Sequence, residues 1–121
     1  MSEFQQIHDV SVMMCPAEGE AIAGEQDALD LVGNAAWQGA RWVVVPVGRF
    51  AEDFFRLRTK VAGDIIQKFV NYRVGLVVLG DISRHTEASS ALQDFVRECN
   101  RGTQTWFLPD LEALRTRLGT A

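Results

Sequence analysis

The segment from Phe54 to Asp81, FFRLRTKVAGDIIQKFVNYRVGLVVLGD, decides the fold class. Between Val61 and Tyr72 the apolar residues recur every three or four positions, which is the period of an amphipathic helix. Val74–Leu79 is a short, uninterrupted apolar run, typical of a strand covered on both faces of a parallel sheet. A helix that leads directly into such a strand predicts an α/β architecture.

The alternation continues toward the N-terminus. We expect residues 1–6 to be flexible, and residues 7–15 to form one strand or two short strands joined by a turn near His8 and Asp9. A helix is expected over residues 26–38 and a strand over residues 42–47. Because proline cannot donate to a sheet ladder, this strand should end at Pro46 or lie at an edge. A helical turn over residues 51–57 leads into the central helix.

Toward the C-terminus the same pattern repeats. A polar loop over residues 82–90 leads to a helix over residues 89–100 and a strand over residues 105–108. Asp110 is placed to cap a last helix over residues 111–118. We therefore predict a single-domain α/β sandwich over residues 1–121. Its sheet should be mixed or mostly parallel, with about four or five strands and about four helices.

Composition narrows the classes of function. The formal net charge of −4 argues against general nucleic-acid binding, because proteins that bind nucleic acids are usually basic. No stretch approaches the roughly 18 apolar residues of a membrane span. The N-terminus lacks the basic cap and apolar run of a signal peptide, so we expect a cytoplasmic location without membrane association. Cys15 and Cys99 are expected to be reduced thiols.

No recognised catalytic pattern is present in the sequence. We find no phosphate-binding glycine loop, no dinucleotide fingerprint and no nucleophile elbow. Neither His8 nor His85 has a cysteine or carboxylate at a spacing typical of zinc sites. We therefore expect no cofactor, no metal and no catalytic residue.

Binding residues are expected in two places. Ligands of parallel sheets favour the crevice beyond the carboxyl ends of the strands, where Asp81 follows the second apolar run. On the polar side of the central segment, Arg58, Lys68 and Arg73 could clamp an anion. Each place has a structural alternative. Asp81 could cap the following turn, and the helix residues could form local ion pairs.

Three stretches, DALDLVGNAAWQGA, FFRLRTKVAGDIIQKFVNYRVGLVVLGDIS and LQDFVRECNRG, resemble the bacterial family catalogued as domain of unknown function 4180. The resemblance covers roughly residues 22–118. It implies that ten polar side chains match the family's motifs, and these are our candidate binding residues: Arg58, Thr59, Gln67, Lys68, Asn71, Arg73, Asp81, Glu98, Asn100 and Arg101. Where Arg56 and Lys60 stand, the family more often has Asp and Gly, so this chain is more basic there.

A weaker, fold-level resemblance is to the STAS (anti-sigma-factor-antagonist-like) domains. Domains of that class dock partner proteins, often under the control of a phosphorylated serine near a helix start. The corresponding loop here, GRFAED at residues 48–53, contains no serine. The resemblance therefore implies protein binding without that phosphorylation switch.

Three hypotheses of function remain open. The first is a non-enzymatic, regulatory α/β module that binds a partner protein or a small ligand. The second is a small enzyme or anion-binding protein with one site around Asp81, Arg58, Lys68 and Asn71. In the third, the polar residues hold the fold together and function depends on formation of a homodimer.

Overall fold

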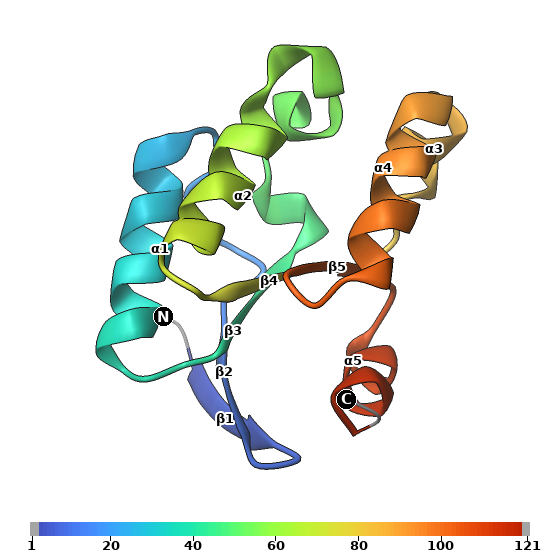
Figure 1. Cartoon of the computed structure of the whole chain (residues 1–121). Helices are drawn as coiled ribbons and strands as arrows, with labels where there is room; N and C mark the ends of the chain where they lie inside the picture. Colours follow the sequence, from blue (N-terminus) through green and yellow to red (C-terminus); the bar gives the residue numbers. More distant parts are fainter. Residues whose placement is uncertain (1–2, 120–121) are drawn as a thin grey trace.

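The computed structural model describes residues 3–119, and a five-stranded sheet forms its centre. β1 (Glu3–Ile7) and β2 (Val10–Met14) form an antiparallel hairpin. β3 (Trp42–Pro46), β4 (Gly75–Leu79) and β5 (Thr105–Leu108) follow in sequence order, each parallel to the strand before it (Figure 1). The sheet is therefore mixed and mostly parallel, as the sequence predicts.

Helices connect the parallel strands. α1 (Glu25–Trp37) joins β2 to β3, and α2 (Val61–Asn71) joins β3 to β4. α3 (Ser83–Glu87) and α4 (Ser90–Arg101) lie between β4 and β5, and α5 (Leu111–Gly119) follows β5. Connections of one hand between neighbouring strands place their helices on the same face of the sheet. In Figure 1, α1 and α2 accordingly lie side by side, and α5 lies apart from them.

The two faces of the sheet carry separate cores. The larger core joins α1, α2 and α4 to the sheet and includes Ile65, Phe69 and Leu76. The smaller core joins α5 to the other face, where the rings of Trp42 and Trp106 stack with their centroids 4.0 Å apart. No helix within residues 3–119 is long and apolar enough to cross a membrane.

Gly75 explains how the two tryptophans meet. β4 lies between β3 and β5, and Gly75 is the direct neighbour of Trp42 in the ladder. A Cβ at Gly75 would lie 2.4 Å from the Trp42 ring. A residue without a side chain is therefore required at this position of β4, so that the rings from β3 and β5 can stack over it.

Three predicted segments differ from the structure. Residues 3–6 are not a loose end but pair with β2, and the turn at His8 and Asp9 has positive φ at both residues, as a tight two-residue hairpin requires. Residues 1 and 2 lie outside the described residues. The segment predicted as a polar loop contains α3, whose short polar sequence has no apolar period to reveal it.

The third difference precedes α2. The sequence predicts one helical turn that continues or kinks into the helix, whereas the chain forms three 3-10 turns, η1 (Val47–Arg49), η2 (Glu52–Phe55) and η3 (Leu57–Thr59). Lys60 then adopts a left-handed conformation with φ of 66°, which separates η3 from α2. We call these three turns the 3-10 segment. It is a separate element from α2, although η2 and η3 pack against that helix, and it is followed by α2 along the chain in Figure 1.

Candidate functional site

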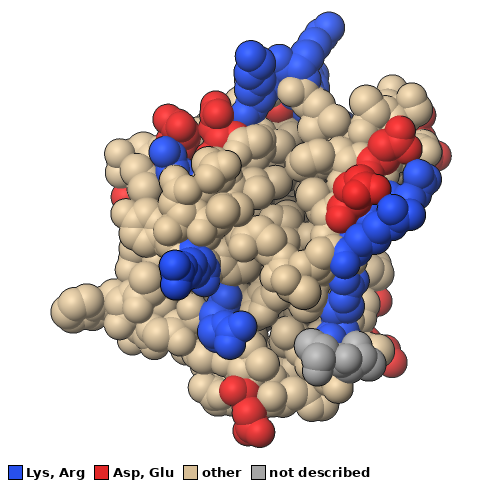
Figure 2. Space-filling model, viewed as in Figure 1, with Lys and Arg blue, Asp and Glu red and all other residues tan. Residues whose placement is uncertain are grey.

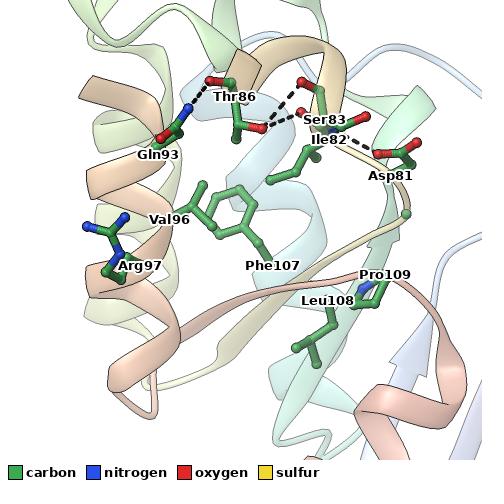
Figure 3. A pocket seen from close by; sticks show the side chains of 11 residues that line it. Asp81, Ile82, Ser83, Thr86, Gln93, Val96, Arg97, Phe107, Leu108 and Pro109 are labelled. Carbon is green, nitrogen blue, oxygen red and sulfur yellow. Dashed lines mark hydrogen bonds between the residues drawn. The ribbon is translucent and has the colours of Figure 1, made fainter. Parts of the chain in front are cut away.

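Two pockets open near the carboxyl ends of the parallel strands, on opposite sides of α3. The first has a volume of about 490 Å³, and we call it the apolar pocket. Its lining comes from the ends of β4 and β5 and from α3 and α4: Gly80, Asp81, Ile82, Ser83, Thr86, Gln93, Val96, Arg97, Phe107, Leu108 and Pro109. Figure 3 shows Ile82, Val96 and Phe107 turned toward one another, so apolar side chains form its floor.

Two polar side chains of the apolar pocket form hydrogen bonds with backbone groups of other residues that line it. Asp81 accepts a 2.8 Å hydrogen bond from the backbone N–H of Ser83, and Gln93 donates a 2.8 Å bond to the carbonyl oxygen of Thr86 (Figure 3). The hydrogen bonds from the backbone and the hydroxyl of Ser83 lower the pKa of Asp81. Asp81 therefore has the turn-capping contact that the sequence left as an alternative.

The second pocket has a volume of about 640 Å³, and we call it the basic pocket. It lies between the 3-10 segment and the start of α4, and its lining is Glu52, Phe55, Arg56, Leu57, Arg58, Arg84, His85, Ala88, Ser89 and Ala91. Three arginines and one carboxylate thus share its walls. In Figure 2, Lys and Arg side chains project at the top of the view, over the 3-10 segment of Figure 1.

Exposed ion pairs tie the arginines of the basic pocket. Arg84 Nη2 lies 2.7 Å from Glu52 Oε1 and 3.3 Å from His85 Nε2, while Arg56 Nη1 lies 3.4 Å from Asp53 Oδ1. The hydrogen bond from Arg84 lowers the pKa of Glu52. Arg58 forms neither an ion pair nor a hydrogen bond within the described part of the chain. Part of the positive charge in this pocket is therefore uncompensated.

The walls of the pocket are held by aromatic packing and by Thr59. The ring of His85 stacks on that of Phe55, with centroids 3.9 Å apart and planes 8° apart. Burial lowers the pKa of His85, and the neighbouring Arg84 lowers it further. Thr59 Oγ1 lies 2.7 Å from the carbonyl oxygens of both Asp53 and Arg56. The Thr59 side chain therefore links the end of η3 back to η2. Thr59 thus shapes the wall of the pocket and does not line it.

The candidate residues do not share one pocket. Arg58 lines the basic pocket and Asp81 lines the apolar pocket. Arg73 lines a third, smaller pocket of about 230 Å³ with Gly75, at the amino end of β4 and thus at the other edge of the sheet. Lys68 and Asn71 line none of these three pockets.

Five of the candidates form pairs on the surface or between helices. Gln67 donates a 2.8 Å hydrogen bond to Asn71, one turn further along α2. Lys68 Nζ lies 3.6 Å from Glu25 Oε1 and so links α2 to α1. Glu98 and Arg101 form an exposed 3.0 Å pair on α4, and acidic and basic side chains lie next to one another on the right of Figure 2. The pairs Gln67–Asn71 and Glu98–Arg101 are local contacts within one helix, whereas Lys68 pairs with a different helix and not with a neighbour on its own.

Asn100, which is partly buried, has a different task. Its side-chain amide accepts a 2.7 Å hydrogen bond from the backbone N–H of Phe107 and donates a 3.2 Å bond to the carbonyl oxygen of the same residue. β5 is the last strand of the sheet, so the Asn100 side chain takes the position of a missing neighbouring strand. Arg117 donates to the backbone carbonyl of Asn100 and lies over the ring of Trp106. We call these four residues the α4–β5 corner.

Sequence reasoning missed much of the basic pocket. Arg84 lies in the segment predicted as a polar loop, and Glu52 belongs to no motif of the sequence. These two residues are 32 positions apart, so no local spacing could have joined them. Within residues 3–119 no group of three or more His, Cys, Asp or Glu side chains could hold a metal ion. Both cysteines are reduced, and burial raises the pKa of the Cys99 thiol.

Comparison with known proteins supplies the family. The family described as Domain of unknown function (DUF4180) matches residues 7–118. No curated protein and no solved structure was found to match the chain. Since the family match covers nearly the whole chain, the protein belongs to the DUF4180 family.

Proposed function

We propose that the protein is a non-enzymatic binding module that takes a small anionic ligand in the basic pocket. The observation that carries the proposal is the gathering of Arg56, Arg58 and Arg84 around one concavity with a single carboxylate. The whole chain has a net charge of −4, so an excess of positive charge in one pocket runs against its average composition. Guanidinium groups suit carboxylate and phosphate ligands because their fixed fork of N–H donors matches these anions.

The form and place of the pocket support the same proposal. A volume of about 640 Å³ is in the range of small-molecule sites. The pocket also lies at the edge where parallel sheets most often bind ligands. Phe55 and His85 add an aromatic wall, and Leu57 and Ala88 add apolar surface for the uncharged part of a ligand.

Calorimetric titration with inorganic phosphate, sulfate and citrate at constant ionic strength tests the proposal. We expect at least one anion to bind, and Arg58→Ala to weaken its binding about tenfold, equivalent to about 1.4 kcal/mol. Arg115→Ala is the matched control, because Arg115 is an exposed arginine on α5, outside the basic pocket. The proposal fails if no anion binds, or if both variants weaken binding equally.

A second candidate function, docking of a protein partner, is favoured by one observation. Trp37 at the end of α1 is 85% exposed, and Tyr72 after α2 is 49% exposed. Exposed Trp and Tyr together with Arg41 and Arg73 are the residue types enriched at the centres of protein interfaces. The simplest partner is a second copy of the chain. Analytical ultracentrifugation over a range of protein concentrations tests whether the protein forms a homodimer. Self-association that Trp37→Ser abolishes would support this candidate, and a monomer at every concentration would exclude the homodimer.

A further inference from the structure

Glu52 is the carboxylate of the basic pocket, and it already occupies one of the arginines. Its Oε1 accepts a 2.7 Å bond from Arg84 Nη2. Both side chains are largely exposed, at 54% for Glu52 and 72% for Arg84. Ion pairs that are this exposed to water contribute little to stability. The contact can therefore be broken at small cost by an anion that binds Arg84 better.

The resident carboxylate sets a requirement for the ligand. A ligand with one carboxylate would replace Glu52 by a group of the same kind, and it would compete with a side chain that is tethered beside Arg84 at high effective concentration. A phosphate monoester carries a charge of about −1.5 to −2 near pH 7 and has three acceptor oxygens. It can accept from Arg84 and also from Arg56 and Arg58, which share the pocket.

From these contacts we infer that Glu52 is a built-in competitor, and that the ligand is a small phosphate monoester whose phosphate takes the place of the Glu52 carboxylate on Arg84. The inference rests on the proposed function, because it specifies the ligand of the same pocket. A small molecule fits better than a flat membrane surface, because the site is a concave pocket with apolar and aromatic walls from Leu57, Phe55 and Ala88.

Titration of phenyl phosphate and of benzoate into the full chain, at pH 7.5 and constant ionic strength, tests the inference. The two probes share a ring and differ in their anionic group. We expect phenyl phosphate to bind the wild-type protein at least tenfold more tightly than benzoate. Glu52→Gln should tighten the binding of both probes by about twofold to fivefold, because it removes the competitor while keeping the size of the side chain, and an exposed ion pair can offset no more than this.

The control is Asp94→Asn, which removes the same charge from an exposed pair of the same kind. Asp94 lies 3.1 Å from Arg97 on α4, outside the basic pocket, and its loss should leave both affinities unchanged. Glu52→Asp provides a second test that does not change net charge. Shortening this side chain by one methylene withdraws the carboxylate from Arg84, so the affinity should rise although the charge is the same.

The outcomes separate this inference from the proposed function. If the wild-type protein binds phenyl phosphate but neither Glu52 variant binds it more tightly, the competitor role is wrong and the proposed function stands. Equal affinities for benzoate and phenyl phosphate would exclude the phosphate class while leaving an anion site. If neither probe binds any variant, and a phosphoserine peptide binds instead, the small-ligand inference is wrong. Absence of binding by every anion would overturn both proposals.

Discussion

The α4–β5 corner and the basic pocket both contain arginine beside an aromatic ring, yet their polar atoms are used differently. In the corner, the Asn100 amide bonds both polar backbone groups of Phe107, and Arg117 is held by backbone carbonyls and the Trp106 ring. In the basic pocket, the pairs are exposed and Arg58 has no partner among the described residues. Polar groups satisfied by the buried backbone stabilise the fold, whereas groups left facing water are available to a ligand.

The largest expected effect comes from breaking the corner. Asn100→Ala leaves the N–H and C=O of the buried Phe107 without their partner, and we expect a loss of about 2 kcal/mol in the free energy of unfolding. Urea denaturation followed by circular dichroism measures this loss. The affinity of the basic pocket for phosphate should not change. A stability within about 0.5 kcal/mol of wild type would mean that Asn100 is not a structural residue.

An intermediate effect is expected at His85, which supports the wall of the basic pocket. Its ring stacks on Phe55, and aromatic pairs of this kind contribute about 0.5–1.5 kcal/mol. His85→Ala should therefore lower the free energy of unfolding by about 1 kcal/mol, while His85→Phe should keep most of it. Thermal denaturation of the two variants side by side provides the measurement, and equal losses would show that the ring contact does not stabilise the wall.

His85 also predicts a dependence of stability on pH. Because its pKa is lowered in the folded state, the unfolded chain binds a proton more readily as the pH falls. The stabilisation from the neutral ring is therefore complete above about pH 6.5, the pKa of an unperturbed histidine, and decreases below it. In His85→Phe, the fall in stability between about pH 6.5 and pH 5.5 should be smaller than in the wild type. Identical pH profiles in urea titrations would contradict this prediction.

The smallest effect is expected from the exposed pair next to Asn100. Arg101 bonds Glu98 at 3.0 Å, but both side chains are about 70% exposed. Arg101→Ala should change the free energy of unfolding by less than about 0.5 kcal/mol. Urea denaturation then compares the free energy of unfolding at two neighbouring positions, Asn100 and Arg101, which were both candidate binding residues. A loss at Arg101 as large as that at Asn100 would remove the distinction between the two regions.

The sequence predicted the parts of the fold that buried apolar residues specify. The apolar stripe predicted α2 because one side of that helix is buried. The apolar runs predicted β3 and β4 because both faces of these strands are buried. Most of β1 was not predicted, because four of its five residues are exposed. β1 is also the outer strand of the sheet. α3 escaped because none of its residues is buried. Elements without a core-facing pattern carry no such signal.

The candidate site was harder to predict, since its geometry depends on contacts between distant segments. Arg58 was predicted as a binding residue, and it does line the basic pocket, but the binding role itself stays a prediction. Asn100 was also a candidate binding residue, but its side chain bonds the backbone of Phe107, seven positions away. Asn100 bonds the backbone because β5 is the outer strand and leaves Phe107 without a strand partner. The order of strands in the sheet cannot be read from spacing in the sequence.

The contact of Asn100 with Phe107 has a consequence for self-assembly. An outer strand with unpaired backbone groups is a template on which further strands, from other copies of the chain, can add and aggregate. At β5 an incoming strand would have to displace the Asn100 amide before it could pair with Phe107. The asparagine thus blocks pairing at that position of the edge, and we expect its loss to make aggregation through β5 easier.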